Sequence, residues 1–318
     1  MKAAVRGALM ACLVCCLLFR ASAEADMAYV YSGVGNLDSR DDFVSQLLIT
    51  ALDRTAPAYG PYSVRKILDQ PRIRQIRDME NGTGMITFAI LGTAHDVSAR
   101  LRPIRIPIDK GVAGYRLLLI RQDRQPDFAV VKTLDDLKRF SFGQDFSWDD
   151  VDILRANGLA VQSGGDFEGL YQMLARKRFD AFPRGIYEAA PELHLRAPAY
   201  PELQIEKTLL LYYPLPIYFW FPRTPKGEEQ AKRLEEGMWS MISDGSYDAL
   251  LWKFSRPALE GLDLAHRRVL VLKNPLLPPQ TPLKDSRLWA SPAQLGLIAP
   301  SQDSAETVMK MPPPQENR

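Results

Sequence analysis

Cysteine and histidine are scarce in this 318-residue chain, which has three residues of each type. The cysteines all lie between positions 12 and 16, so the remaining chain cannot form a disulfide bond. The histidines are far apart, and no HExxH or CxxC spacing accompanies them. Because a metal site needs several such ligands at close range, we expect neither a metal site nor a cofactor. The residues concerned are Cys12, Cys15, Cys16, His95, His194 and His266.

Motifs of the common enzyme classes are also missing. The chain contains no GxSxG nucleophile elbow and no GxxxxGK[ST] phosphate-binding loop, and Gly164-Gly165 stands outside any GxGxxG pattern. Lysine and arginine number 40 against 38 aspartate and glutamate residues, a net charge of +2 without an evident basic stripe. This balance provides no long-range attraction for nucleic acid. We therefore expect a protein that is not an enzyme and does not bind nucleic acid.

The first 23 residues have the pattern of a secretory signal peptide. Lys2 and Arg6 precede an apolar run at 8–19, and Ala21-Ser22-Ala23 has the A-x-A form of a cleavage site. The apolar run is shorter than the ~20 residues that a membrane-spanning helix needs. We predict cleavage after Ala23 and a periplasmic protein; the alternative is an uncleaved signal anchor.

The segment 140–185 alternates between short apolar runs and segments of helical period. The runs at 140–142, 159–161 and 179–182 predict strands, and the segments between them carry apolar residues on one face, as amphipathic helices do. Strands that alternate with helices over short links indicate a parallel sheet with right-handed crossovers. Ligands of such sheets bind beyond the carboxyl ends of the strands.

Candidate ligand contacts follow from this placement. Arg184 follows the third strand and can bind a carboxylate or phosphate with its planar guanidinium; alternatively, it pairs with Glu188, one helical turn further on. Trp148 provides an apolar wall or packs against a helix. Asp145 binds an ammonium group or caps a loop. Gln144 belongs to the same strand-to-helix segment, whose backbone amides would contact a polar group of the ligand.

The first half of the chain repeats this strand–helix order. An uninterrupted apolar run at 85–91 predicts a buried strand. Thr93 and His95 lie in the loop after it, at the position of the ligand loop in the second half; a structural role for His95 is the alternative. Tyr31 ends the first expected strand and belongs either to the wall of the cleft or to the core. Three arginines follow this loop: Arg100, Arg102 and Arg105. Either Arg100 binds an acidic group of the ligand, or all three form a solvated face.

Several segments resemble periplasmic solute-binding proteins of family 3, the polar amino acid-binding components of ABC transporters. They are Leu134-Asp135-Asp136-Leu137, Phe142-Gly143-Gln144 and Arg178-Phe179-Asp180-Ala181. Downstream, residues 244–254 resemble the closing segment of that family, in which a DG-(T/S)-(Y/F) turn leads into a short helix ending in K-(W)-F. The resemblance covers most of residues 24–256.

This resemblance implies an α/β, two-lobed periplasmic-binding-protein type II fold. Each lobe would be a mostly parallel sheet flanked by helices, with the ligand cleft between the lobes. The expected parts are a signal peptide at 1–23, the first part of lobe 1 at 24–121, lobe 2 at 122–213, a return segment of lobe 1 at 214–256 and an extended or disordered C-terminal tail at 257–318.

Two departures from the family pattern bear on the ligand. The family holds an α-carboxylate with an arginine in a T-x-(E)-R segment of lobe 1, where this chain reads Thr93-Ala94-His95-Asp96-Val97. It holds an α-ammonium with an aspartate after the last lobe-2 strand, where this chain has Pro183-Arg184. Because a cation replaces an anion there, we expect a small polar solute that is anionic or amino-acid-like.

The resemblance further implies a monomer that delivers its solute to an ABC permease or to a membrane sensor. One alternative is an enzyme on the same fold, a lyase like cyclohexadienyl dehydratase, with Glu168, Glu188 or Asp145 as the cleft carboxylate. Another is a periplasmic signalling protein without a small ligand, whose cleft would be filled by its own side chains.

Overall fold

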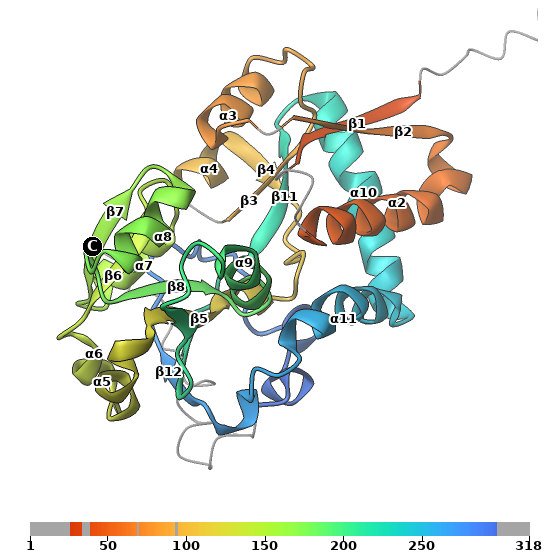
Figure 1. Cartoon of the computed structure of the whole chain (residues 1–318). Helices are drawn as coiled ribbons and strands as arrows, with labels where there is room; N and C mark the ends of the chain where they lie inside the picture. Colours follow the sequence, from red (N-terminus) through yellow and green to blue (C-terminus); the bar gives the residue numbers. More distant parts are fainter. Residues whose placement is uncertain (1–25, 34–38, 69, 93–94, 298–318) are drawn as a thin grey trace, which may run out of the picture.

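The structure is a computed structural model that describes residues 26–33, 39–68, 70–92 and 95–297. The expected signal peptide and Thr93 lie outside these residues. Three β-sheets organise the described chain, a two-stranded and a three-stranded sheet in lobe 1 and a seven-stranded sheet in lobe 2, and Figure 1 shows helices packed on their faces. None of the described helices is both long enough and apolar enough to span a membrane.

The sheets of lobe 1 are assembled from strands far apart in the sequence. Their first two strands pair in parallel, and their last strand pairs antiparallel with two others. The amide of Thr87 donates to the carbonyl of Val30 at 2.8 Å, which joins the two groups. The two-stranded sheet is β2 (Tyr62–Ile67) with β1 (Met27–Ser32), and the three-stranded sheet has the order β3 (Ala89–Gly92), β11 (Ile217–Pro222) and β4 (Leu101–Pro103).

Helices cover both faces of these sheets. On one face, Gly237 lets two long helices approach closely, because a Cβ there would lie 2.0 Å from the carbonyl oxygen of Ala51. The helices of this face are α2 (Ser39–Tyr59), α10 (Pro225–Ser243) and α11 (Ser246–Leu259). Those of the other face are α3 (Arg72–Glu80) and α4 (His95–Arg100).

Lobe 2 contains a larger mixed sheet. Its pairings are parallel between β6 and β7, β6 and β8, and β10 and β12, whereas β5 pairs antiparallel with β8, β9 and β10. The path is β12 (Arg268–Val271), β10 (Leu209–Tyr212), β5 (Tyr115–Arg121), β8 (Ala181–Gly185), β6 (Ser141–Asp145) and β7 (Ala160–Gly164), with β9 (Leu203–Ile205) beside β5.

The strand–helix alternation expected for 140–185 is confirmed in this sheet. The chain runs β6, α7, β7, α8 and β8, with α8 and α9 on one face and α7, α5 and α6 on the other. The bounds are α5 (Gln125–Ala129), α6 (Leu134–Leu137), α7 (Asp150–Ala156), α8 (Phe167–Ala175) and α9 (Ala189–Arg196). Short 3-10 turns are η1 (Val112–Gly114), η2 (Gln122–Arg124), η3 (Leu264–His266), η4 (Ser286–Leu288) and η5 (Pro292–Leu295).

The first passage between the lobes differs from the expected boundary at residue 121. Strand β5 belongs to the lobe-2 sheet, so the passage precedes Tyr115. The reason is long-range pairing, since Leu117 and Leu119 are fully buried between partner strands that follow much later in the chain. The two passages touch at Gly114, where a Cβ would lie 2.1 Å from the carbonyl oxygen of Tyr213.

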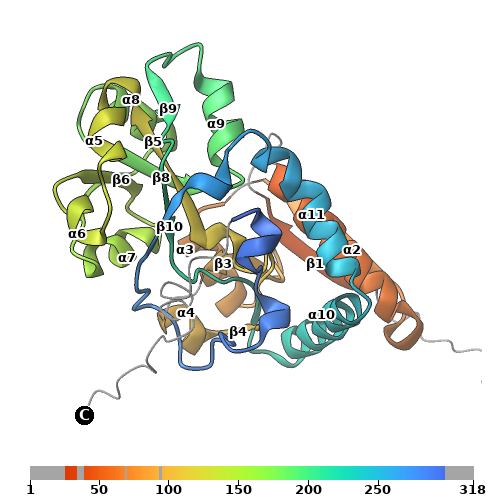
Figure 2. The same ribbon diagram turned by 90° about the horizontal axis from the view of Figure 1, so that it is seen from below.

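Residues 257–297 also differ from the expected extended or disordered tail. They contribute β12 to the lobe-2 sheet and then cross to lobe 1, where the guanidinium of Arg287 lies 4.9 Å from the Trp239 ring of α10. Just after Arg287, Trp289 covers Gly111, and Ala290 donates its amide to the Lys110 carbonyl at 2.8 Å. Figure 2 shows this blue segment running past both passages; we call residues 268–297 the strap.

Candidate functional site

Arg184 ends β8, as expected, but its charge is already neutralised inside lobe 2. The residue is 5% exposed. Its Nε and Nη2 donate to the two carboxylate oxygens of Glu192 on α9, both at 2.7 Å, and Nη2 also lies 3.0 Å from Glu188. Burial alone would lower the pKa of Arg184, but the two glutamates raise it above its ordinary value. The alternative of pairing with Glu188 is therefore present, in a buried rather than a surface setting.

Aromatic rings surround the Arg184 guanidinium. It lies 4.7 Å from the Trp148 ring centroid, 5.1 Å from that of Phe167 and 5.3 Å from that of Phe182. Trp148 in turn stacks on Phe182 at 6.3 Å with an interplanar angle of 9°. Contacts of this kind fix the orientation of the arginine and of the indole together. Trp148 thus packs within lobe 2 while remaining partly exposed.

A second buried arginine extends the same network. Arg116 on β5 lies 3.6 Å from Glu188 and 3.0 Å from Asp150, and its Nε donates to the Tyr213 hydroxyl at 3.0 Å. Tyr213 also donates to Asp150. Burial raises the pKa of Tyr213 well above its ordinary value, so its hydroxyl stays protonated. Glu188 connects the two arginines, and the network braces the strand ends that face lobe 1.

Asp145 and Gln144 have different surroundings at the end of β6. Asp145 accepts hydrogen bonds from the amide of Ser147 at 2.8 Å and from its hydroxyl at 2.6 Å, so it caps this loop. Gln144 is fully buried, and its Nε2 donates weakly to the Pro183 carbonyl at 3.4 Å. Its Oε1 has no hydrogen-bond donor among the described residues. Gln144 therefore has acceptor capacity that the protein itself does not use.

Of the expected lobe-1 residues, Tyr31 lies apart from this group. Tyr31 is 1% exposed and stacks on Phe88 at 5.2 Å in the core below α2, so the core alternative describes its position. His95 begins α4, whose position after β3 agrees with the expected loop. Thr93, in the same loop, is among the residues that the structure leaves undescribed.

The two lobes meet at Asp149, directly before α7. Its Oδ1 accepts a hydrogen bond from Nη1 of Arg72 in lobe 1 at 3.2 Å. Its other carboxylate oxygen lies 2.5 Å from the position that a Cβ on Gly92 would occupy. Gly92 ends β3, so the carboxylate of lobe 2 lies at the strand end where lobe 1 was expected to bind its ligand.

Sequence reasoning missed the carboxylates that occupy this region. Asp149 has the sequence signature of a first-turn acid of α7, and nothing local indicates that it reaches lobe 1. Glu192 lies two helical turns beyond Arg184, a spacing that offers a weak signal because Glu188 lies between them. Nothing in the sequence indicates the contact between Arg116 and Asp150, since only the β5–β8 pairing and the packing of α7 bring them together.

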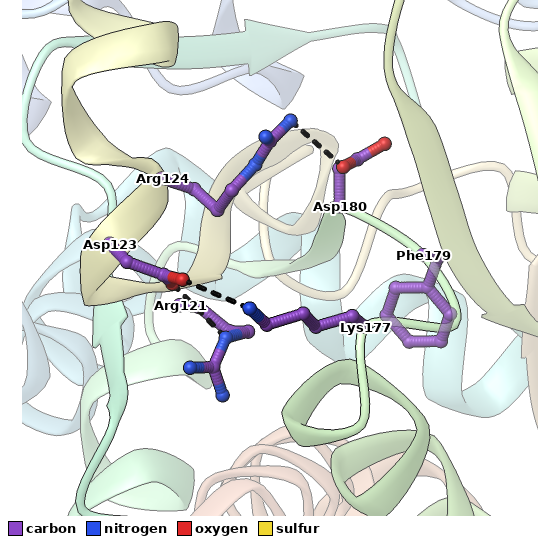
Figure 3. A pocket seen from close by; sticks show the side chains of 6 residues that line it. All are labelled: Arg121, Asp123, Arg124, Lys177, Phe179 and Asp180. Carbon is purple, nitrogen blue, oxygen red and sulfur yellow. Dashed lines mark hydrogen bonds and ion pairs between the residues drawn. The ribbon is translucent and has the colours of Figure 1, made fainter.

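One depression lies elsewhere on lobe 2, near the end of β5 (Figure 3). It has a volume of about 250 Å³ and is lined by Arg121, Asp123, Arg124, Lys177, Phe179 and Asp180. Its cations are paired with its own carboxylates, as the dashed lines show. None of the expected ligand residues lines it. Among the described residues, no group of three or more histidine, cysteine or acidic side chains is placed to hold a metal ion.

Comparison with known proteins gives no match to a protein-family model and none to a curated sequence. Solved structures do match. An ancestral arginine-binding protein bound to arginine shares 15% identity over 71% of this chain and 97% of its own, with a TM-score of 0.51. The VFT2 domain of Bordetella pertussis BvgS, in a double-mutant form, shares 16% identity over 72% and 93%, with a TM-score of 0.52.

A third match is the ancestral amino acid-binding protein AncCDT-1, a precursor of cyclohexadienyl dehydratase. It shares 13% identity over 72% of this chain and 95% of its own, with a TM-score of 0.51. The chain has the two-lobed fold of periplasmic solute-binding proteins. This confirms the fold class expected from the sequence, and at these identities the likeness concerns the fold alone. In this fold, the Asp149–Arg72 contact joins the strand ends of the two lobes.

Proposed function

We propose that this protein binds a small polar solute between its two lobes and that closure around the solute is read by a membrane partner. The partner would be an ABC permease or a sensor, and the protein would act as a monomer in the periplasm. Two of the matched structures support binding in general, because one is an arginine-binding protein and the other an amino acid-binding protein.

The Asp149–Arg72 contact is the observation that carries this proposal. It is polar and lies at the strand ends, where β3 of lobe 1 meets the start of α7 in lobe 2. The side chain of Arg72 is 25% exposed and that of Asp149 is 13% exposed, so water can replace the contact when the lobes separate. A partly hydrated ion pair contributes about 1 kcal/mol or less, which favours reversible closure over permanent docking.

The surroundings of the cleft carboxylates favour binding over elimination chemistry. A general acid or base needs a carboxyl group that can exchange a proton with the substrate. Glu188 pairs with Arg184 and Arg116, Glu168 pairs with Arg196, and Asp145 caps its own loop. These contacts support a protein that is not an enzyme.

Arg184 has a supporting role in this proposal, and its neighbours provide the ligand contacts. Its pairing with Glu188 and Glu192 leaves little charge to attract an anion, but it fixes the ring of Trp148. Trp148 would then form an apolar wall, and Gln144 would accept a hydrogen bond from the solute.

A second candidate function follows from the position of Asp149. Its carboxylate could serve as a built-in substitute for a ligand carboxylate, since it already contacts Arg72 and reaches Gly92. The protein would then signal without a small ligand. Under this alternative, the lobes stay closed in the purified protein, and Asp149→Ala opens them.

Native mass spectrometry and small-angle X-ray scattering of residues 24–318 test the two candidates. Solute binding predicts a co-purified molecule, or a member of a panel of amino acids, dicarboxylates and phosphorylated metabolites that raises the melting temperature and reduces the radius of gyration. If no compound binds and Asp149→Ala alone enlarges the radius of gyration, the solute-binding proposal is wrong.

A further inference from the structure

Tyr218 lies on β11 of lobe 1, and Arg105 lies two residues after β4, the strand that pairs with β11. The antiparallel register of β4 and β11 places Pro103 opposite Trp220, and the amide of Ile104 donates to the Phe219 carbonyl at 2.9 Å. Arg105 follows Ile104 at a bend of the chain, just beyond the paired part of β4. The two side chains are near enough that the arginine charge influences the titration of the tyrosine hydroxyl.

Neither side chain has a polar partner in the described part of the protein. Tyr218 is fully buried, yet its hydroxyl makes no hydrogen bond there. The Nη1 of Arg105 is buried and likewise unpaired. The neighbouring arginines differ, because Arg100 pairs with Glu80, and Arg102 pairs with Glu228 and Glu235. Arg105 is partly exposed, so only its buried Nη1 departs from the solvated face expected for the three arginines.

Both unpaired groups are hydrogen-bond donors. A guanidinium only donates hydrogen bonds, whereas a tyrosine hydroxyl both donates and accepts, but Nη1 of Arg105 and the Tyr218 hydroxyl make no hydrogen bond to each other. Burial raises the pKa of Tyr218, with Arg105 acting in the opposite direction, so the hydroxyl keeps its proton. Two buried donors and one positive charge call for an acceptor with negative charge.

The position of this pair relates it to the cleft. Tyr218 lies opposite Leu91 on β3, and the preceding residue, Ile217, lies opposite Gly92. Gly92 is the strand end reached by Asp149 of lobe 2. That carboxylate pairs with Arg72, whereas Nη1 of Arg105 has no partner in the described part of the chain.

We propose that Arg105 and Tyr218 form a binding site for a small oxyanion or carboxylate in lobe 1. The anion is either a resident inorganic ion or the acidic group of the cleft solute, and only the second form rests on the proposed function. In that form, Arg105 supplies the cation that the Thr93–Val97 segment lacks. The site selects solutes that carry a carboxylate or an equivalent anion.

Variants of the two donors test this site with acetate as the probe. Acetate at constant ionic strength should raise the melting temperature of residues 24–318. Tyr218→Phe keeps the ring, Arg105→Gln keeps a donor without the charge, and each should weaken acetate binding about tenfold. Arg100→Gln, which alters a paired arginine of the same lobe, is the matched control and should bind as the original protein does. Urea unfolding verifies that each variant folds, and Arg105→Lys replaces Arg105→Gln if the latter does not.

Bromide soaks of crystals identify the occupant directly. An anomalous peak between Nη1 of Arg105 and Oη of Tyr218 supports the site, whereas water alone at that position overturns it. Equal acetate binding in all variants also overturns it. If solute binding is found and neither variant affects it, the solute form fails while the proposed function stands. If no solute binds but the anion effect depends on both donors, the proposed function fails while the anion site stands.

Discussion

Asp149 of lobe 2 and Arg72 of lobe 1 form an ion pair across the strand ends, with Oδ1 and Nη1 3.2 Å apart. The pair is flanked by Gly92, where any side chain would displace the carboxylate. A polar contact at this place favours the arrangement in which the two lobes are closed. Closure would then depend on the Asp149 carboxylate, which the carboxylate of a solute could replace.

If the lobes are closed in the purified protein, as the alternative of signalling without a ligand requires, removal of this ion pair should open them. Asp149→Asn and Arg72→Gln are each expected to enlarge the radius of gyration measured by X-ray scattering. In a double-mutant cycle, the two changes should couple by about 0.5–1 kcal/mol in the free energy of unfolding, because the pair is partly exposed. Asp152→Asn, on an exposed turn of the same helix, is the control. Strict additivity of the two changes would show that the contact has no energetic role.

Replacement of Arg184 should destabilise lobe 2 rather than only affect a ligand. Arg184→Met removes the arginine that binds the Glu192 carboxylate and leaves Glu188 with Arg116, so we expect a loss of about 3–5 kcal/mol in the free energy of unfolding. Adding Glu192→Gln should recover part of that loss. Arg176→Met, at an exposed position, should change stability by less than about 0.5 kcal/mol. Urea unfolding distinguishes this outcome from a simple ligand contact, which would leave the stability unchanged.

Local patterns in the sequence were sufficient to predict much of lobe 2. The strands observed at 141–145, 160–164 and 181–185 each lie within three residues of the expected runs, because alternation of apolar runs and amphipathic helices is a local property. Arg184 was likewise predicted at the strand end. Its partner Glu192 was not, because that contact depends on how α9 packs beside β8.

Long-range pairing explains what the sequence could not reveal. The run at 115–121 is a clear strand, but its assignment to lobe 2 depends on β8, β9 and β10, which follow it by more than 60 residues. The strand at 268–271 is short and lies among prolines, so only its pairing with β10 shows that it belongs to the fold. Arg105 is similar, since its lack of a partner can be recognised only when its neighbours are placed.

Gln144 should affect affinity more than stability. Its Oε1 accepts no hydrogen bond from the described residues, so Gln144→Leu should alter the free energy of unfolding by no more than about 1 kcal/mol. If the solute donates to this oxygen, the same change should weaken solute binding about tenfold in calorimetric titration. Gln162→Leu, on the exposed face of the neighbouring strand β7, should leave both quantities unaltered. Unchanged affinity in Gln144→Leu would remove this residue from the site.

The stability contributed by Asp244 should depend on pH in acid. Hydrogen bonds from the amide and hydroxyl of Ser246, together with Arg54, lower the pKa of Asp244 from 3.8 to about 2. A carboxyl whose pKa is lowered by folding stabilises the native state above its unfolded pKa and loses that effect as the pH falls through the folded value. The difference in unfolding free energy between Asp244 and Asp244→Asn should therefore be constant near neutral pH and shrink between about pH 4 and pH 2. A difference that persists at the acid end would assign the effect to packing instead.

The strap should be required for a stable lobe 2. Its strand β12 pairs with β10, whose Leu209, Leu210 and Leu211 are fully buried, so removing residues 268–318 should expose this edge and increase binding of a hydrophobic dye. Leu270→Ala, at a buried position of β12, should lower the free energy of unfolding by about 2–3 kcal/mol. Val269→Ala, at the adjacent position that is 37% exposed, should cost less than about 1 kcal/mol. Equal effects of the two substitutions would mean that β12 does not pack against lobe 2, and the strap would then be an appendage rather than a strand of the sheet.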